Sequence, residues 1–283
     1  MNSDPRPLSA GLYLVATPIG NARDITLRAL DVLAAADTLA AEDTRTARRL
    51  MEIHGVPLGG RRVLAYHDHS SAPDRARLVE AARTGSLAYV SEAGTPLLAD
   101  PGFRLAREVR SAGGAVTAVP GASALLAALS VGGLPTDRFF FAGFLPSARA
   151  ARRAALAELA QVPATLVLYE SPNRVTDLLG DIAEGLGPDR PVSLCRELTK
   201  KFEEVVSGPA GAIDPAGLTL KGEFVVLVGA AEKGEGPGEE EIDAALRQAM
   251  ETMRVKDAAT AVAGALGLPR REVYQRALTL RES

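Results

Sequence analysis

Residues 91–102 read Ser-Glu-Ala-Gly-Thr-Pro-Leu-Leu-Ala-Asp-Pro-Gly, and they stand between a short apolar run and a helical pattern. The apolar run, residues 87–90, predicts a buried strand. A strand followed by a Gly/Pro-rich loop and a helix is where an open α/β sheet binds its ligand. Gly94 lets the backbone approach a bound molecule, and Glu92 and Asp100 add two carboxylates. The stretch predicts a binding loop, although a rigid crossover loop that binds nothing would look similar.

The same order of strand, polar loop and helix recurs through the first half of the chain. The predicted strands cover residues 12–16, 38–41, 63–66, 87–90 and 116–119. Five such units predict a mainly parallel sheet with helices on both faces. Because each loop follows the carboxyl end of its strand, we expect the loops to form one site at a common edge of the sheet.

The second half predicts another α/β domain, with a mixed sheet. Its strand patterns cover residues 139–144, 165–169, 192–196, 202–207 and 223–228. Turn residues rather than a long helix separate the last two, which favours antiparallel pairing. We therefore expect an N-terminal α/β domain over residues 1–134 and a second α/β domain over residues 135–231.

The C-terminal part predicts a small helical unit behind a linker. Residues 232–240 are rich in Gly and Glu and are typical of a linker. Within residues 241–283, two helical patterns at Val255–Leu266 and Arg270–Leu280 flank Gly-Leu-Pro, which predicts a helix-turn-helix-like unit. Helical bundles often share this shape, so it does not by itself indicate DNA binding.

Composition is that of an ordinary globular protein, with 47% hydrophobic and 24% charged residues. A net charge of −3 argues against indiscriminate nucleic-acid binding, so RNA contacts would need local basic clusters. The single cysteine, Cys195, allows no internal disulfide, which suits a reducing compartment. No apolar stretch is long enough to span a membrane and no signal-peptide core is evident, so we expect a cytoplasmic protein.

Two familiar kinds of site are disfavoured by their missing signatures. The loop at residues 17–21, Thr-Pro-Ile-Gly-Asn, has one glycine, so the dinucleotide fingerprint is absent, as is the P-loop. A ligand with an adenosine but no phosphate remains possible. His67 and His69 resemble a metal pair, but only His54 accompanies them, and a closed zinc site needs three or four ligands. We expect no metal, and substrate contact or plain solvation for these histidines.

Charged clusters follow two predicted strands of the second domain. They are residues 170–174, Glu-Ser-Pro-Asn-Arg, and residues 196–201, Arg-Glu-Leu-Thr-Lys-Lys. A charge run is usually a solvated face, but these two stand where the second domain would meet the loops of the first. Arg45 and its neighbours in the first domain add candidate phosphate contacts, for which surface ion pairs are the simpler explanation.

Several stretches together resemble one family. They are Leu14–Asn21, Glu42–Arg45, Tyr66–His69, Ala93–Pro96 with Asp100–Gly102, Pro120–Ser123, Tyr169–Arg174 and Arg196–Lys200. In this order they resemble the ribosomal small-subunit RNA (cytidine-2′-O)-methyltransferases of the tetrapyrrole methylase superfamily. The resemblance covers nearly the whole chain, including the helical tail. Each motif alone is weak, and the ordered set is specific.

The resemblance implies two α/β domains of the tetrapyrrole-methylase type with S-adenosylmethionine between them, usually in a homodimer. The acceptor would be the 2′-hydroxyl of a cytidine in the decoding region of 16S ribosomal RNA, presented by the small ribosomal subunit. The residues that would bind the cofactor are Thr17, Pro18, Gly20, Gly94, Thr95, Pro96, Leu97, Ala122, Ser123 and Tyr169. Those that would bind substrate are Arg45, His67, His69, Asn173, Arg174 and Arg196.

A ribose hydroxyl is a poor nucleophile at neutral pH, so a base or an electrostatic stabiliser would help methyl transfer. Lys200 is the first candidate base, because the nearby positive charges of Arg196 and Lys201 would lower its pKa and favour a neutral amine. Glu197 and Glu170 are the alternative bases.

Two other functions remain open from the sequence. A methyltransferase of a tetrapyrrole or another small molecule would have the same fold, with an enclosed acceptor cavity and no need for the basic clusters or the tail. A non-enzymatic nucleic-acid-binding protein would use the C-terminal helices alone and would not bind S-adenosylmethionine. Fold by itself does not decide between them.

Overall fold

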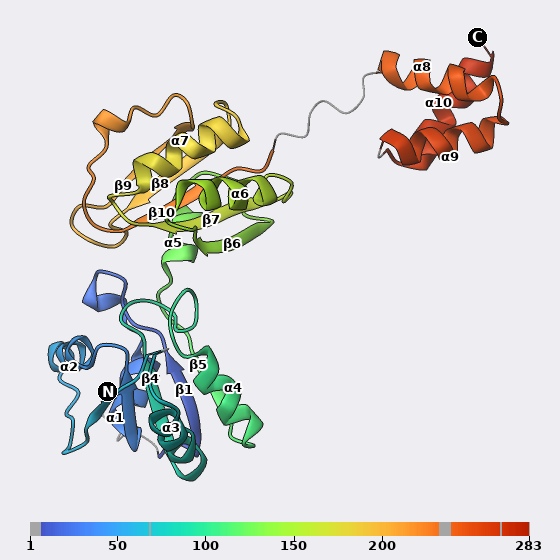
Figure 1. The fold of residues 1–283 in the computed structure, drawn as a ribbon. Helices are drawn as coiled ribbons and strands as arrows, with labels where there is room; N and C mark the ends of the chain where they lie inside the picture. Colours follow the sequence, from blue (N-terminus) through green and yellow to red (C-terminus); the bar gives the residue numbers. More distant parts are fainter. Residues whose placement is uncertain (1–6, 68, 232–238, 267, 283) are drawn as a thin grey trace. The chain divides into compact units, whose positions relative to one another are not determined.

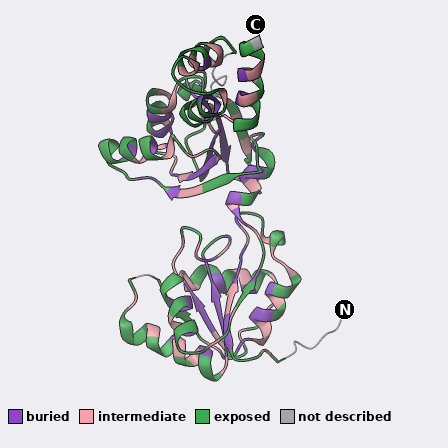
Figure 2. Cartoon of the chain, turned by 90° about the vertical axis from the view of Figure 1, so that its right-hand side faces the viewer, coloured by how far each residue is buried: buried purple, intermediate pink, exposed green. Residues whose placement is uncertain are grey.

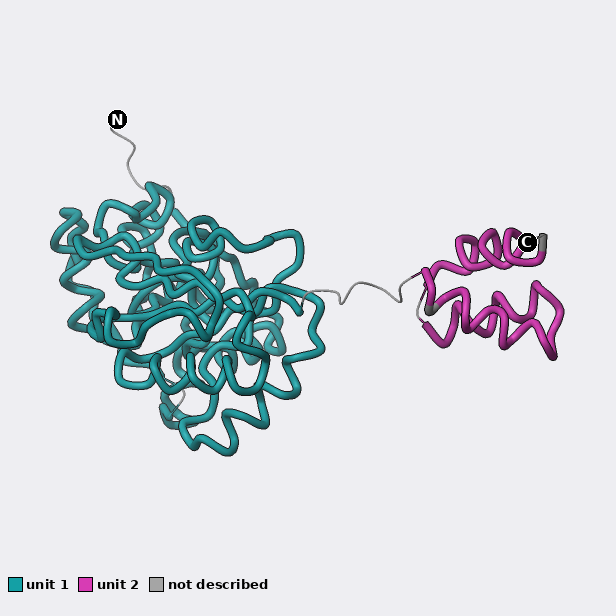
Figure 3. The backbone as a smooth tube through the Cα atoms, turned by 90° about the horizontal axis from the view of Figure 1, so that it is seen from above, with its two compact units in different colours: residues 1–231 teal, residues 232–283 magenta. Residues whose placement is uncertain are grey.

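The computed structural model describes residues 7–67, 69–231, 239–266 and 268–282. The chain divides into two compact units, residues 1–231 and 232–283 (Figure 3). The larger unit contains two five-stranded sheets, and the smaller one contains helices (Figure 1). No helix within the described residues has the length and apolar character that a membrane span requires.

The first sheet is parallel throughout, as predicted, with the strand order β3-β2-β4-β1-β5. The strands are β1 (Gly11–Val15), β2 (Thr38–Ala41), β3 (Val63–Ala65), β4 (Ser86–Val90) and β5 (Val116–Val119). Every residue of the central strand β4 is buried, and the middle strands of this sheet are drawn largely in purple in the lower part of Figure 2. A strand buried on both faces explains the uninterrupted apolar run that the sequence shows there.

Helices cover both faces of this sheet and bury one core on each. One core packs under α1 (Leu27–Ala35) and α2 (Thr44–Ile53), and the other under α3 (Ala72–Thr84) and α4 (Phe103–Ser111). Side-chain caps fix the starts of three of these helices, including Asp43, which accepts from the amide nitrogens of Arg45 and Thr46 at the start of α2. A short 3₁₀ helix, Ala22–Asp24, follows β1.

The second sheet is mixed, as predicted, with the order β6-β7-β10-β8-β9. Its strands are β6 (Phe139–Phe144), β7 (Thr165–Glu170), β8 (Pro191–Arg196), β9 (Glu204–Pro209) and β10 (Phe224–Val228). Only β6 and β7 are parallel; the other pairs are antiparallel. The expected pairing of the last two strands with each other is wrong: β10 lies between β7 and β8, and β9 pairs with β8. β9 also begins at Glu204, because Phe202 lies in the turn that precedes it.

Two helices, α6 (Arg149–Leu159) and α7 (Val175–Leu186), cover one face of the second sheet, and α5 (Ala124–Val131) covers the other. The α5 helix follows the last strand of the first sheet, yet its buried Leu125, Ala128 and Leu129 pack on β7, β8 and β10. The chain therefore passes from the core of the first sheet to that of the second before residue 134. The expected domain boundary at residue 134 stays a prediction.

The smaller unit consists of α8 (Glu239–Met250), α9 (Val255–Leu266) and α10 (Arg270–Glu282). They share an apolar core that includes Leu246, Val262 and Val273, and Arg276 of α10 donates to Asp243 of α8 at 2.6 Å. The predicted helices α9 and α10 lie where the sequence places them. Of the predicted linker, residues 232–238 lie outside the described residues, and residues 239 and 240 open α8.

Candidate functional site

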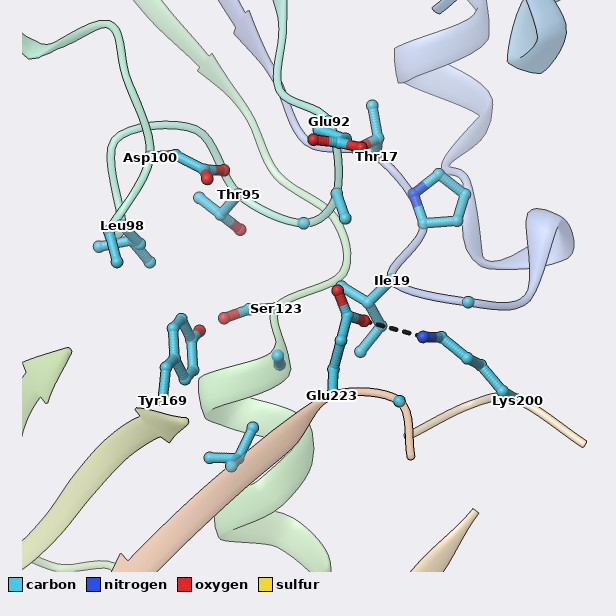
Figure 4. A pocket seen from close by; sticks show the side chains of 18 of the residues that line it. Thr17, Ile19, Glu92, Thr95, Leu98, Asp100, Ser123, Tyr169, Lys200 and Glu223 are labelled. Carbon is cyan, nitrogen blue, oxygen red and sulfur yellow. Dashed lines mark hydrogen bonds and ion pairs between the residues drawn. The ribbon is translucent and has the colours of Figure 1, made fainter. Parts of the chain in front are cut away.

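A cavity of about 690 Å³ lies between the loop edge of the first sheet and one edge of the second (Figure 4). The loops after β1 and β4 line it from the first sheet. The end of β7, the loop after β8 and the start of β10 line it from the second. This is the carboxyl edge of the parallel strands, where topology predicts a ligand site.

Seven of the ten residues predicted to bind the cofactor line this cavity: Thr17, Pro18, Gly20, Gly94, Thr95, Ser123 and Tyr169. The other three support the wall from behind. The Ala122 carbonyl accepts a hydrogen bond from the Thr95 hydroxyl at 3.0 Å. The Leu97 side chain packs against Gly102, and Pro96 is buried.

Backbone pairing joins the loops after β1 and β4. The Thr17 amide donates to the Gly94 carbonyl at 2.9 Å, and the Gly94 amide donates back to the Thr17 carbonyl at 3.0 Å. Gly94 has φ +81°, and a Cβ atom there would lie 3.2 Å from Cγ2 of Ile19. Conformation and space therefore both favour glycine at this point of the cavity wall.

The loop that carries Asp100 is strained. Leu97 and Ala99 have φ values of 74° and 59°, which non-glycine residues rarely adopt. Asp100 is partly buried and its side chain faces the cavity, as Figure 4 shows. Burial, together with the negative charges of Glu42 and Glu92, raises the pKa of Asp100 to about 7.

The expectation that positive neighbours lower the pKa of Lys200 is wrong. Its ammonium nitrogen lies 2.7 Å from Oε1 of Glu197 and 2.8 Å from Oε2 of Glu223. Although burial opposes it, the two carboxylates raise the pKa of Lys200, and Lys200 in turn lowers the pKa of Glu197. Lys200 lines the cavity as a charged, paired ammonium group.

The Lys200 loop also touches the first sheet's loops directly. A Cβ atom on Gly20 would collide with Cγ of Lys200, so the lysine stem passes over the glycine. Next to it, the amide of Asn21 donates to the Thr199 hydroxyl at 3.1 Å. Gly20 is therefore needed for close approach between two loops on opposite sides of the cavity.

Glu170 is a fixed carboxylate. It is 3% exposed, accepts from the Ser171 amide at 2.8 Å and lies 3.1 Å from Nη2 of Arg174. Arg174 also donates to the Leu145 carbonyl at 2.8 Å. The Glu170–Arg174 pair therefore links the end of β7 to the segment that follows β6. Asn173 is exposed and lies outside the cavity lining.

The structure does not bring the other residues predicted to bind substrate into the cavity. Arg196 is 8% exposed and donates to Glu204 at 2.9 Å, so it joins β8 to β9. Arg45 is exposed and pairs with Asp43, and the exposed His67 and His69 have ring centroids 6.1 Å apart. No group of three metal-ligating side chains was found in the described part of the chain.

Sequence reasoning missed one wall of the cavity. Four residues of α2 line it: Thr46, Arg49, Leu50 and Ile53. Their spacing of three or four residues places them on one face of a helix. That spacing is visible in the sequence, but it predicts only phosphate contacts for Arg45 and its neighbours; Arg45 itself is exposed and does not line the cavity.

Most of the chain matches one known family. Residues 11–214 match the family described as Tetrapyrrole (Corrin/Porphyrin) Methylases, and residues 236–281 match the RsmI C-terminal HTH domain. Ribosomal RNA small subunit methyltransferase I of Mesorhizobium japonicum is 46% identical over 283 residues, which cover 98% of this chain and 95% of the relative.

Solved structures share the fold at lower identity. A conserved hypothetical protein from Aeropyrum pernix K1 aligns with a TM-score of 0.63 and 20% identity, covering 95% of this chain and 96% of its own. Uroporphyrin-III C-methyl transferase from Thermus thermophilus, in complex with S-adenyl homocysteine, aligns with a TM-score of 0.53 and 21% identity, covering 77% of this chain and 97% of its own. At these identities the likeness concerns the fold.

Proposed function

Because this chain belongs to the ribosomal RNA small subunit methyltransferase I family, we propose that it transfers a methyl group from S-adenosylmethionine to the 2′-hydroxyl of a cytidine in the decoding region of 16S ribosomal RNA. The observation that carries the proposal is the 46% identity over nearly the full length of both chains. The match of residues 236–281 to the RsmI C-terminal HTH domain supports the same family rather than a tetrapyrrole enzyme.

The residues around the cavity fit S-adenosylmethionine. Its volume of about 690 Å³ lies within the range of small-molecule pockets, and its walls combine apolar and polar groups. Gly94 has no side chain to narrow the cavity wall, and Glu92 places negative charge near a cationic ligand. We assign the cofactor to Thr17, Pro18, Gly20, Gly94, Thr95, Ser123 and Tyr169.

The cofactor supplies a methyl group already activated by positive sulfur, so the protein supplies orientation and electrostatics. Aligning the ribose oxygen with that methyl group is expected to provide most of the rate enhancement. The strained loop at residues 97–99 and the pairing between Thr17 and Gly94 fix one wall of the cavity. The ion-paired Lys200 holds the opposite wall against Gly20.

The α2 helix is our proposed RNA-facing edge. Arg49 lines the cavity, and Arg45 and Arg48 are exposed on the same helix, where they would meet phosphates. A cytidine must leave its stack for its 2′-hydroxyl to enter the cavity. We therefore propose that RNA within the small ribosomal subunit is the substrate and that the reaction occurs in the cytoplasm.

We also propose that the protein acts as a homodimer. Phe139 and Phe140, each 44% exposed, lie on β6, which is an edge strand of the second sheet. Apolar side chains on an unpaired edge favour association with another copy. Light scattering across a dilution series would measure the mass; a monomer at working concentration would contradict this part of the proposal.

Incubation with radiolabelled S-adenosylmethionine tests the activity, using small ribosomal subunits, naked 16S ribosomal RNA and tetrapyrrole precursors as separate acceptors. A 2′-O-methyl group makes the neighbouring phosphodiester resistant to alkali, so label in an alkali-resistant dinucleotide is the expected result. Label only in a tetrapyrrole would move the activity to a small molecule. Nucleic-acid binding without transfer would indicate a binding protein.

A further inference from the structure

The ionisable side chains that line the cavity differ in how far they are already engaged. Glu170 is held by its neighbouring amide and by Arg174, as described above. Lys200 and Glu223 pair with each other at 2.8 Å. Arg49 pairs with Glu52 at 3.1 Å. Each of these groups is paired with an oppositely charged neighbour, and the pairs hold the walls in place.

Two carboxylates that line the cavity, Glu92 and Asp100, form no side-chain hydrogen bond or ion pair with any described residue. Glu92 is exposed, whereas Asp100 is partly buried. The left-handed conformations of Leu97 and Ala99 precede it directly, so the backbone is held in an unfavourable shape where the carboxylate faces the cavity. Strain of this kind persists where the surrounding structure enforces it, and it clusters at functional sites.

We propose that Asp100 accepts the proton of the ribose 2′-hydroxyl during methyl transfer. This inference rests on the proposed function. The oxygen–hydrogen bond breaks as the bond from that oxygen to the methyl carbon forms, and the electron pair of the carbon–sulfur bond stays on sulfur. The proton moves to a carboxylate oxygen of Asp100 and then to solvent, so charge and atoms balance.

The electrostatics of the cavity support this role. Burial, Glu42 from the loop after β2 and Glu92 from the loop after β4 raise the pKa of Asp100 to about 7. A general base works best when its pKa lies near the working pH, because it is then ionised to a useful extent and still binds a proton well. On the facing sheet, burial raises the pKa of Tyr169, so this phenol stays a neutral donor.

The same groups predict the pH dependence. The carboxylate form of Asp100 is the active one, so kcat/KM for the RNA substrate rises with pH through the pKa of Asp100. Glu42 and Glu92 both hold that pKa up, and removing either charge lowers it. The positive group that interacts with Glu92 is Arg45, whose pKa is raised chiefly by its hydrogen bond to Asp43 and to a smaller extent by the charge of Glu92.

The central variant is Asp100→Asn, which keeps the shape of the side chain and removes the proton acceptor. We expect kcat with small ribosomal subunits to fall by roughly 10²–10⁴-fold, the usual contribution of a general base. Calorimetric binding of S-adenosylmethionine to the free protein should change by less than about threefold, since a base contributes little to ground-state binding. Asp100→Glu should restore part of the activity.

Asp31→Asn is the matched control, because Asp31 is exposed on α1 and away from the cavity. It should keep wild-type kcat. Thermal unfolding of Asp100→Asn, Asp100→Glu and the control establishes that all three fold.

Glu92→Gln supplies a readout that does not depend on turnover. In the free protein, the ¹³C carboxyl resonance of Asp100 should titrate at a lower pH in this variant than in the wild type. The acid limb of the pH–rate profile should move in the same direction. A purely structural role for Asp100 predicts the shift of its resonance but no shift of the pH–rate profile.

The outcomes separate the inference from the function on which it rests. Wild-type protein that methylates no RNA refutes the proposed function. Active wild type with a fully active Asp100→Asn variant refutes the role of Asp100. Tenfold weaker cofactor binding at unchanged kcat also refutes it, because Asp100 would then be a cofactor-binding group.

Discussion

Gly20→Ala tests whether the Lys200 loop and the loop after β1 are packed as tightly as the structure indicates. The new Cβ atom would lie 2.9 Å from the Thr199 hydroxyl oxygen and 3.0 Å from the Leu198 carbonyl oxygen, and it would collide with Cγ of Lys200. The lysine side chain can move, but the Leu198 carbonyl belongs to the backbone. Overpacking of this kind typically costs about 1–3 kcal/mol.

For a unit of this size that loss corresponds to a melting temperature lower by roughly 2–12 °C. Differential scanning calorimetry of the full chain measures it. The matched control is Gly180→Ala, on the exposed side of α7 with no atom within 4 Å of the added Cβ. There the same change should stabilise by about 0.5–1 kcal/mol, because glycine is unfavourable inside a helix.

A double-mutant cycle isolates the lysine's part of the effect. In the Gly20→Ala background, Lys200→Ala removes the colliding methylene groups and should recover part of the lost stability. The reasoning fails if Gly20→Ala melts at or above the wild-type temperature. It also fails if the two substitutions are simply additive, since their side chains would then not be in contact.

Three further outcomes are expected. Arg152→Met should lower the free energy of unfolding in urea by about 1–3 kcal/mol, because the carboxylate of Asp181, which is 1% exposed, loses its partner at 2.7 Å and keeps only Arg149 at 3.1 Å. The double variant with Asp181→Leu should be more stable than Arg152→Met alone, and the reverse order would contradict the argument. Hydrogen bonds from Ser86 lower the folded-state pKa of Asp37 from its usual value near 3.8. The stability that the Asp37 carboxylate gives the fold is therefore present above the unfolded pKa and is lost as pH falls through the folded pKa. Asp37→Asn should flatten the acid limb of stability measured by urea unfolding from pH 5 to pH 2, and an unchanged slope would contradict it. Lys200→Met, which keeps the stem but not the charge, should raise KM for S-adenosylmethionine more than it lowers kcat, whereas a catalytic base would show the opposite pattern.

Pattern reasoning predicted both sheets because each depends on local signals. Buried strands leave apolar runs such as that of β4, and turn residues indicate antiparallel strands in the second sheet, although not that β9 pairs with β8 rather than with β10. It misjudged Lys200 because the partners of a side chain depend on tertiary contacts. Arg196 and Lys201 are its neighbours in sequence, but Arg196 pairs with Glu204 instead. Glu223, which binds Lys200, comes from the start of a distant strand.

The same limit explains why the sequence predicts a carboxylate at Asp100 in the binding loop but does not predict its role as a base. Its loop was recognised from Gly94 and the two prolines, yet a raised pKa requires burial and the charges of Glu42 and Glu92 together. Glu42 follows a different strand, and only the parallel sheet brings these strand ends to one edge. Topology predicts that such groups meet, but not which of them remains without a partner.

The strained residues suggest how work is divided between the two walls of the cavity. In the described part of the chain, left-handed non-glycine residues occur as two pairs, Leu97 with Ala99 and Glu197 with Thr199. The second pair belongs to a loop in which Glu197 and Lys200 pair with each other, so its strain fixes the position of that ion pair. The first pair leads into Asp100, whose carboxylate is left available. We therefore expect substitutions in the first loop to act mainly on kcat and those in the second mainly on binding and stability.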